Sequence, residues 1–327
     1  MLALALTSCA PAQIAAIRVQ RTNVKVLAVG LTNPLTGVSS ETPQPWQQRP
    51  VLAVKIGNSS PERPQSGLDR ADLVYEELTE GGETRFLAMF LTNSPDRLGP
   101  VRSCRTVDPA IIAPTGGLFG YSGGVGFVIS AVRAVPNVTD VGADVNGDDY
   151  VRDPNRKMPY NLYTSADKLW AGHTGRPPQK PQFDFLGSAD DISSGGSNGR
   201  QVNMTFERTP VRYGYDPGSR TYLRYNGTLP HTTETGQLAY RNVVIQIVEA
   251  SSGSYTDSAG NPTHEFNLVG SGRAVVLRGG RAFEGRWTRS SRSEPAKFTD
   301  AAGNPLLLAP GKTIVELLPS GQQVSYS

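Results

Sequence analysis

The chain has 327 residues, of which 35 are glycine and 25 are proline, and charged residues make up 19% of it. This composition is typical of a soluble, turn-rich protein of one large or two ordinary domains, closer to a β-rich protein than to a helical bundle. The net charge of +3 is too small to predict a nucleic-acid partner. No stretch is apolar over enough residues to predict a membrane-spanning helix.

The N-terminus has the features of an export signal. An apolar run ends in Leu6-Thr7-Ser8-Cys9, which resembles a bacterial lipobox with Cys9 as the acylated residue. The run is short and no basic residue precedes Arg18, so we expect the signal to begin upstream of Met1. A chance cysteine on a cytosolic N-terminus is the alternative. We predict an extracytoplasmic protein, anchored to the outer face of the bacterial plasma membrane only by lipid on Cys9.

The predicted fold is α+β and has two parts. In order, we predict a signal remnant, a polar tether, an N-terminal α+β domain with a layered mixed sheet, a flexible linker rich in Gly, Ser and Asp, and a β-rich C-terminal domain. These cover residues 1–9, 10–49, 50–186, 187–201 and 202–327. The division rests on turn-rich and proline-containing stretches that interrupt the apolar runs.

The N-terminal domain is predicted to begin with strands at 51–56, 73–77 and 85–91, the last two joined by the glycine turn at 80–83. Short helices are predicted over 67–72 and 107–113, and residues 125–133 fit either a strand or a helix. In the C-terminal domain, short apolar runs separated by Gly and Pro turns predict strands at 202–206, 211–215, 221–225, 242–248, 273–277, 281–287 and 313–317.

Acids and arginines interrupt the apolar strands between residues 63 and 105. An unpaired buried ion costs several kcal/mol or more, so such charges must be paired, hydrogen-bonded or exposed at a site. The segment therefore marks a candidate ligand-binding site, with Asp72, Glu77, Glu80, Thr84, Arg85, Arg102, Ser103 and Arg105 as its residues.

Two interpretations of these charges remain open. Strand alternation places Glu77 on one face and Glu76 on the other. The structural interpretation is that Glu77 or Glu80 forms buried pairs with arginines, and we expect Glu77, Arg85 and Arg102 to lie close together. Such a network is compatible with a ligand site beside it.

A second arginine segment supplies further candidates. Arg152 and Arg156 are followed by Asn161 and Tyr163, just before a predicted helix start at Thr164 or Ser165. Arginines beside a helix N-terminus favour an anion. We therefore expect this segment to converge with residues 102–105 on one cleft.

Other motifs are weak. The glycine-rich residues 116–124 lack the phosphate-loop pattern GxxxxGK[ST], and residues 144–155 lack the glycine and glutamate of a calcium loop. The three histidines have no metal-ligand spacing, and no GxSxG elbow occurs. Ser103 is a nucleophile in principle, but a hydrogen-bonding serine among arginines is favoured. We predict no cofactor and no metal.

Several motifs resemble the YerB-like bacterial lipoprotein family. They include Arg63-Pro64-Gln65-Ser66-Gly67-Leu68, Gly99-Pro100-Val101-Arg102-Ser103 and Pro159-Tyr160-Asn161-Leu162-Tyr163-Thr164. The resemblance covers roughly residues 33–318. It implies an α+β layered arrangement with a separately recognised C-terminal region, and no settled activity. Cys104 stands where the resemblance implies a small residue, so it gives no support to a catalytic thiol.

Two classes of function follow. The first is a cell-envelope protein that binds an anionic small molecule or cell-wall component through its arginine and glutamate cluster. The alternative is an envelope hydrolase with Glu77 or Glu80 as acid/base. A carboxylate with a raised pKa in an open cleft would favour the enzyme, and an ion-paired set would favour binding. A purely structural role in the envelope and the oligomeric state both stay open.

Overall fold

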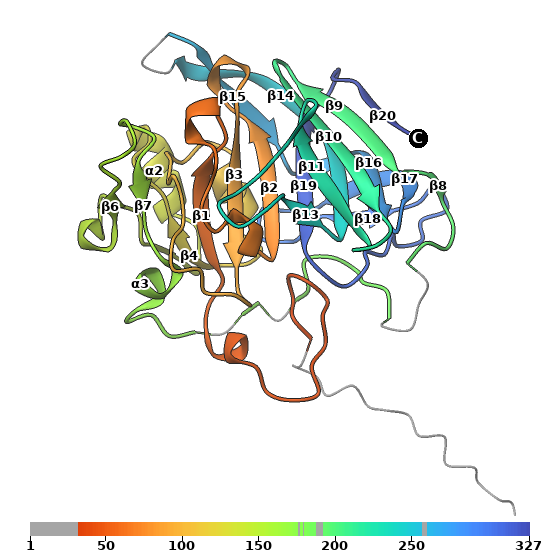
Figure 1. Ribbon diagram of the computed structural model, residues 1–327, viewed down its shortest axis with the longest axis horizontal. Coiled ribbons are helices and arrows are strands. Elements are labelled where there is room, and N and C mark those ends of the chain that lie inside the picture. The colour runs from red at the N-terminus through yellow and green to blue at the C-terminus, as the bar shows by residue number, and fades with distance from the viewer. Residues whose placement is uncertain (1–31, 176, 179, 188–191, 257–259) are drawn as a thin grey trace, which may run out of the picture.

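The computed structural model describes residues 32–327 except residues 176, 179, 188–191 and 257–259. The predicted signal remnant with Cys9, and the tether up to residue 31, lie outside the described residues. The described chain forms a large mixed sheet, a smaller sheet packed against one of its faces, and a few short helices (Figure 1).

The large sheet has twelve strands. Ten of them lie in the spatial order β18 (Lys297–Thr299), β17 (Arg281–Arg289), β16 (Gly270–Arg278), β14 (Asn242–Thr256), β19 (Thr313–Pro319), β2 (Leu73–Leu78), β3 (Thr84–Phe90), β1 (Leu52–Gly57), β4 (Gly117–Gly120) and β5 (Val138–Asp140). The other two are β15 (Pro262–Asn267) beside β14 and β8 (Ser197–Asn198) beside β17.

The smaller sheet consists of β12 (Leu229–Pro230), β11 (Thr221–Asn226), β10 (Thr209–Asp216), β9 (Gln201–Phe206) and β20 (Val324–Tyr326), with β13 (Ala239–Tyr240) beside β11. A separate two-stranded ladder pairs β6 (Val151–Arg152) with β7 (Leu162–Tyr163). The α-helices are α1 (Asp108–Ile112), α2 (Gly126–Arg133) and α3 (Ala166–Trp170). Single 3-10 turns are η1 (Pro45–Gln48), η2 (Ser60–Glu62), η3 (Leu68–Arg70), η4 (Glu80–Gly82) and η5 (Gly147–Asp149).

The two halves of the chain share the large sheet. Strand β19, close to the C-terminus, inserts between β14 and β2 and runs parallel to both. Backbone hydrogen bonds therefore continue from the predicted C-terminal region directly into the predicted N-terminal region. The described part of the predicted linker also packs on the body: Ile192 is buried, and β8 pairs with β17.

The predicted strands are present, and the helices are shorter than predicted. The helix predicted over 67–72 is only the 3-10 turn η3, and residues 125–133 form the helix α2 rather than a strand. The glycine-rich segment contributes β4. The molecule is thus mostly β with mixed sheets, and the layered α+β description applies only loosely. No helix among the described residues is long and apolar enough to cross a membrane.

Strand alternation divides the core between the two faces of the large sheet. On one face, Val74 and Phe86 belong to a cluster with Val202 and Tyr213 of the smaller sheet. On the other face, side chains such as Leu87 pack with α1 and α2. Full burial of one such side chain contributes about 1.5–3 kcal/mol, so these contacts fix the sheet and both coverings relative to each other.

Candidate functional site

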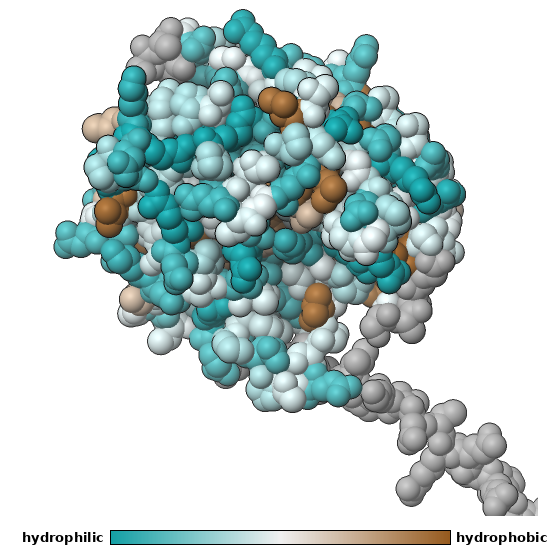
Figure 2. All heavy atoms as spheres, in the orientation of Figure 1, coloured by the Kyte–Doolittle hydropathy of each residue, from teal (hydrophilic) through white to brown (hydrophobic). Residues whose placement is uncertain are grey.

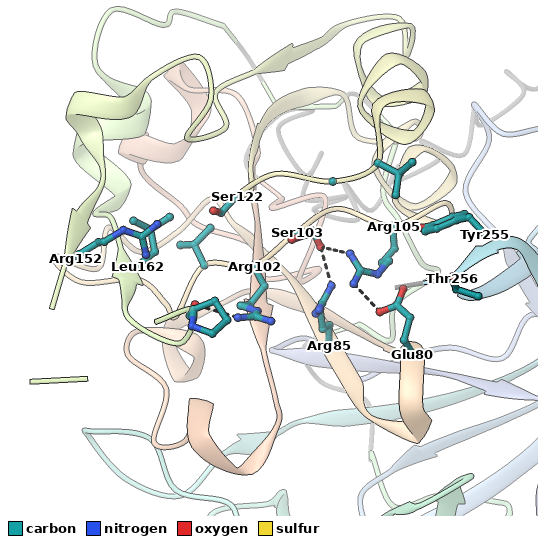
Figure 3. Close-up of a pocket in the computed structure, with 14 residues that line it drawn as sticks. Glu80, Arg85, Arg102, Ser103, Arg105, Ser122, Arg152, Leu162, Tyr255 and Thr256 are labelled. Carbon is teal, nitrogen blue, oxygen red and sulfur yellow. Dashed lines mark hydrogen bonds and ion pairs between the residues drawn. The ribbon is translucent and has the colours of Figure 1, made fainter. Parts of the chain in front are cut away.

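A cavity of about 460 Å³ lies beside the end of the β2–β3 hairpin (Figure 3). Five segments meet there: the hairpin, residues 101–105, residues 122–125 before α2, the β6–β7 segment, and the β14–β15 hairpin. The lining side chains are mainly polar and include four arginines but one carboxylate: Arg85, Arg102, Arg105, Arg152 and Glu80, with Ser103, Ser122, Tyr255 and Thr256.

The hairpin turn places Glu80 at the cavity. Gly81 and Gly82 follow it with φ angles of 71° and 76°, a left-handed conformation that favours glycine. Glu80 accepts a hydrogen bond from Arg105 at 2.6 Å. Burial acts to raise the pKa of Glu80, but the hydrogen bond and the charge of Arg105 outweigh it, so this pKa is lowered. The structure thus contains one of the expected glutamate–arginine pairs.

Arg102 is held by contacts on two sides. Its Nε lies 2.8 Å from the carboxylate of Glu62, and its Nη1 donates to the carbonyl of Pro159 at 3.0 Å. Glu62 is buried and also accepts from the amide and hydroxyl of Ser59. Arg102 is therefore fixed in position before any ligand arrives.

Arg85 is the least compensated charge of the cavity. It is 9% exposed, and its Nη1 donates a hydrogen bond to the backbone carbonyl of Ser103 at 3.2 Å. No described carboxylate forms an ion pair with it. Burial, together with the charges of Arg105 and Arg102, lowers the pKa of Arg85 to about 10. Figure 3 shows Arg85 and Arg105 converging on Ser103 from separate segments.

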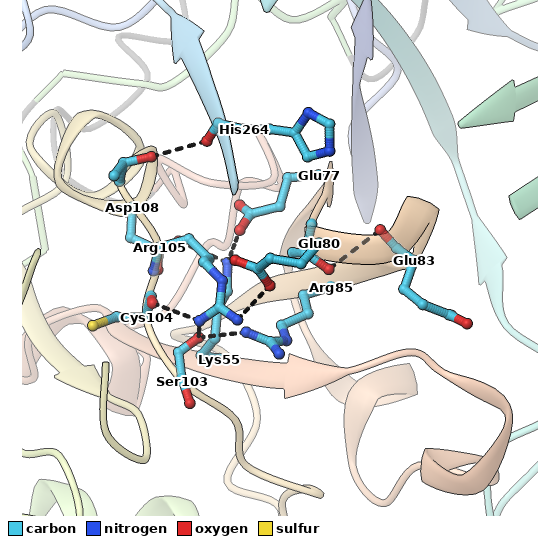
Figure 4. A network of polar contacts seen from close by, with 12 residues as sticks. Lys55, Glu77, Glu80, Glu83, Arg85, Ser103, Cys104, Arg105, Asp108 and His264 are labelled. Carbon is cyan, nitrogen blue, oxygen red and sulfur yellow. Dashed lines mark hydrogen bonds and ion pairs between the residues drawn. The ribbon is translucent and has the colours of Figure 1, made fainter. Parts of the chain in front are cut away.

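Glu77 lies behind the cavity in a closed network (Figure 4). Its carboxylate is fully buried and contacts the ammonium of Lys55, which also donates to Asp108 at 2.7 Å. Asp108 in turn accepts from the amide of Arg105 at 2.6 Å. Burial raises the pKa of Glu77 to about 7, although Lys55 acts to lower it. The expected partners of Glu77 were arginines, and the actual partner is a lysine.

The second arginine segment divides between two places. Arg152 lines the cavity and is oriented by Asn161, whose side-chain oxygen accepts from it at 2.9 Å. Arg156 is absent from the cavity lining. It donates to the carbonyls of Pro61, Arg63 and Pro64 and to the hydroxyl of Tyr163. The expected convergence therefore holds for Arg152 and fails for Arg156, because the β6–β7 connection turns Arg156 toward the loop after β1.

Three other predicted residues have structural contacts away from the cavity. Asp72 accepts from the amides of Leu91 and Thr92, both at 2.7 Å. Thr84 donates to Glu76 at 2.7 Å on the opposite face of the sheet. Tyr163 is buried between Arg156 and Arg97. The guanidinium of Arg97 lies 3.7 Å from the centroid of the Tyr163 ring. These residues shape the fold around the cavity and do not line it.

Sequence reasoning missed several residues that build the site. Lys55 had a visible signal, since it is one lysine within an otherwise apolar strand. Glu62 and Asp108 had no comparable signal, because each lies in a turn-like or helical segment where an acid is ordinary. Tyr255 was missed because the predicted strand ended at residue 248, whereas β14 continues to Thr256.

Metal and thiol chemistry receive no support from the described residues. No cluster of three or more potential metal ligands occurs among them. Cys104 is buried, and burial raises the pKa of its thiol to about 12. A thiol with this pKa stays protonated at neutral pH and is a poor nucleophile.

On the face shown in Figure 2, apolar residues lie scattered among hydrophilic ones.

Comparisons with known proteins match most of the chain. It matches the family described as "Protein of unknown function (DUF3048)", with the N-terminal domain over residues 35–179 and the C-terminal domain over residues 201–315. It is 30% identical over 317 residues to "Putative lipoprotein YerB" of Bacillus subtilis (strain 168), covering 94% of this chain and 92% of that protein. Its fold is similar to the crystal structure of YerB protein from Bacillus subtilis. The TM-score is 0.74 and the identity 25%, over 90% of this chain and 99% of that one.

Proposed function

The chain belongs to the DUF3048 family of YerB-like proteins, and we propose that it is a cell-envelope protein that binds an anionic ligand in the arginine cavity. The cavity lining carries four arginines and one glutamate, which gives a formal charge of 4 − 1 = +3. Convergent cations concentrate positive potential and hold a multivalent anion better than scattered ones.

The observation that carries the proposal is Arg85. A guanidinium this deeply buried normally has a carboxylate partner, because desolvation of a charge costs several kcal/mol. Arg85 instead faces the cavity beside two further arginines, and its pKa is lowered to about 10. An anion bound in the cavity would supply the missing opposite charge. The uncompensated charge of Arg85 therefore favours binding of an anion in the cavity.

The hydrolase alternative receives less support from the carboxylates. Glu80 is ion-paired with Arg105 and its pKa is lowered, so it holds no proton to donate at neutral pH. Glu77 has a raised pKa but is fully buried behind the cavity, with Lys55 and Asp108 around it. An acid/base group must reach the substrate directly or through one water. The geometry therefore favours binding.

The location of the protein is part of the proposal. The relative from Bacillus subtilis is named as a lipoprotein, and Cys9 follows a lipobox-like sequence. We infer that Cys9 is lipidated and holds the chain on the outer face of the plasma membrane. The anionic ligand is then a component of the cell envelope, a small molecule or part of a wall polymer.

Calorimetric titration with inorganic phosphate tests the proposal. Arg85→Met removes the charge at the cavity, and Arg286→Met is the matched control because Arg286 is an exposed strand arginine outside the cavity. We expect Arg85→Met to weaken binding at least about tenfold, since one charge-assisted hydrogen bond is worth about 1.5–3 kcal/mol. Binding to the wild type should weaken as salt rises. Equal affinity of wild type and Arg85→Met would overturn the proposal.

A further inference from the structure

We propose that the ligand is a glycosyl phosphate, with its phosphoryl group on Arg85, Arg105 and the first turn of α2, and its sugar on the aromatic pair Tyr255 and Phe127. This inference rests on the proposed function and names the chemical class of its ligand. It adds two features of the cavity that the arginines alone do not explain, the start of α2 and the aromatic wall.

The N-terminus of α2 opens onto the arginine cavity. Gly124 and Val125, which precede the helix, line the cavity. The N-cap residue Val125 offers no side-chain acceptor, and the first turn has no acidic residue. Within the described chain, no group accepts a hydrogen bond from the amides of Gly126 or Phe127. Free amides and the helix dipole at such an end favour an anion.

The donors around the cavity suit a phosphoryl group better than a carboxylate. Arg85 and Arg105 approach from two different segments, and the backbone of Gly124 and Val125, just before α2, belongs to a third. A phosphate monoester presents three acceptor oxygens and a charge of about −1.5 to −2 at neutral pH. A carboxylate presents two oxygens in one plane and a single charge. The phosphoryl group, with three acceptor oxygens and a charge of about −2, therefore fits this positive lining better than a carboxylate does.

The cavity is too large for an inorganic ion. Its volume of about 460 Å³ falls in the range of about 300–1,000 Å³ that is typical of sites for whole small molecules. A phosphate ion held by Arg85 and Arg105 would leave most of this space to water. The remaining wall is formed in part by Val125 and Tyr255. The bound phosphate is therefore expected to carry an organic group directed toward these residues.

An aromatic pair lies between this cavity and a second one. Tyr255 lines the arginine cavity and meets Phe127 edge-on, with 5.3 Å between ring centroids. Phe127 is half-exposed and lines a neighbouring cavity of about 240 Å³. That cavity mixes apolar side chains with polar ones, among them Thr106, Glu265 and Arg292.

This mixture fits a sugar better than a hydrocarbon chain. One face of a sugar ring presents C–H groups that pack on an aromatic side chain, and its hydroxyls can both donate and accept hydrogen bonds. A hydrocarbon chain would displace water from the exposed guanidinium of Arg292 without replacing its hydrogen bonds, which is unfavourable. The geometry therefore points to a phosphorylated sugar rather than a lipid phosphate.

Calorimetric titration with five probes separates the parts of this inference. The probes are inorganic phosphate, methyl phosphate, octyl phosphate, glucose 1-phosphate and N-acetylglucosamine 1-phosphate. We expect at least one sugar phosphate to bind about tenfold more tightly than methyl phosphate, which corresponds to about 1.4 kcal/mol. Phe127→Ser should remove most of this gain and leave the affinity for methyl phosphate within about twofold. Leu229→Ser is the control, because Leu229 is an exposed apolar residue that lines neither cavity.

Each other outcome counts against a specific step. If methyl phosphate binds and neither sugar phosphate binds more tightly, the glycosyl assignment is wrong and the anion-binding function stands. A larger gain for octyl phosphate than for either sugar phosphate would assign the second cavity to a hydrocarbon and overturn the inference. Absence of binding by every phosphate probe would remove both the inference and the proposed function. If Leu229→Ser loses the tighter binding of the sugar phosphate as Phe127→Ser does, this tighter binding does not depend on the aromatic pair.

Discussion

Glu77 and Arg85 stand directly opposite each other in the antiparallel ladder between β2 and β3, yet their side chains do not form an ion pair. Glu77 contacts Lys55, which reaches it from β1. Arg85 is thereby left without the carboxylate that lies nearest in the ladder, and it faces the cavity. This division of partners links the packing of the sheet to the proposed function.

The first prediction concerns the stability of the protein without ligand. Arg85→Met should leave the melting temperature in phosphate-free buffer unchanged or raise it, because it removes a buried charge that has no ion-pair partner among the described residues. Phosphate at about 100 times the wild-type Kd should stabilise the wild type by about 2.7 kcal/mol, and a variant that binds tenfold more weakly by only about 1.4 kcal/mol. Thermal melts with and without phosphate measure both effects. A large drop in the phosphate-free melting temperature would show that Arg85 is mainly structural.

The second prediction is a pH dependence that arises from Glu77. Its pKa is raised from 4.5 to about 7 in the folded protein, so across this window the unfolded chain loses its proton first. The contribution of Glu77 to stability is therefore full below pH 4.5 and is lost as the pH rises to about 7. Glu77→Gln does not titrate, so its stability relative to the wild type should rise across the window.

Urea denaturation of both proteins, from below pH 4.5 to above pH 7, measures this difference. The control is Glu284→Gln, since Glu284 is an exposed carboxylate on β17. Parallel stability curves for the wild type and Glu77→Gln would show that the buried carboxylate is already ionised at low pH.

The third prediction separates the two arginines of the β6–β7 segment. Arg156→Ala should lower the melting temperature, because it removes hydrogen bonds to the carbonyls of Pro61, Arg63 and Pro64, each worth about 0.5–1.5 kcal/mol or more with a charged donor. Arg152→Ala should leave the melting temperature within a degree or two, because Arg152 is exposed, and weaken phosphate binding a few-fold. Melts and titrations of the two variants should give opposite patterns. Weaker phosphate binding by the folded Arg156→Ala variant would show that Arg156 contributes to the binding site after all.

The sequence predicted which charged residues lie near one another better than it predicted their pairings. Alternation along β2 placed Glu76 and Glu77 on opposite faces, and the structure has them in two different networks. The pairing partners could not be predicted, because Lys55 reaches Glu77 from a strand two positions away and Arg224 reaches Glu76 from the smaller sheet. Local patterns determine which face a side chain occupies. Tertiary packing determines what it meets there.

The misplaced residues have the same physical explanation. Arg156 lies in a connection between two-residue strands, where no periodicity predicts the direction of a side chain. Tyr255 reaches the cavity because β14 extends beyond its apolar core into a solvent-exposed hairpin with β15. An apolar pattern cannot indicate this extension. The convergence of Arg85, Arg102 and Arg105 was predictable because they lie on adjoining, short segments.

The fourth prediction concerns the lipid anchor. If Cys9 is acylated, a fatty-acid probe should label the protein expressed from its complete gene in its own host, and Cys9→Ser should abolish the labelling. Cys104→Ser is the control, because Cys104 is the only other cysteine in the sequence and is buried. The labelled protein should fractionate with membranes. Labelling of the Cys9→Ser variant, or none in the wild type, would contradict lipidation at this residue.

The last prediction concerns the buried pair that joins the two sheets. Arg224 from β11 donates to both oxygens of Glu76, at 2.8 and 2.6 Å, and both side chains are fully buried. Beside them, Glu316 accepts from Tyr213, and burial together with the charge of Glu76 raises the pKa of Glu316 well above its ordinary value. Burial and the charge of Glu76 thus disfavour ionisation of Glu316, and Arg224 is the cation paired with Glu76.

Arg224→Met should accordingly destabilise the protein by about 3–5 kcal/mol, because it leaves Glu76 as an uncompensated buried charge. The double variant Glu76→Gln with Arg224→Met should recover at least half of this loss, because it leaves no charge in the interface between the sheets. Urea denaturation at neutral pH measures both. A loss below about 1 kcal/mol in Arg224→Met would mean that water or rearranged side chains already compensate Glu76. In that case hydrophobic packing alone would hold the smaller sheet against β2.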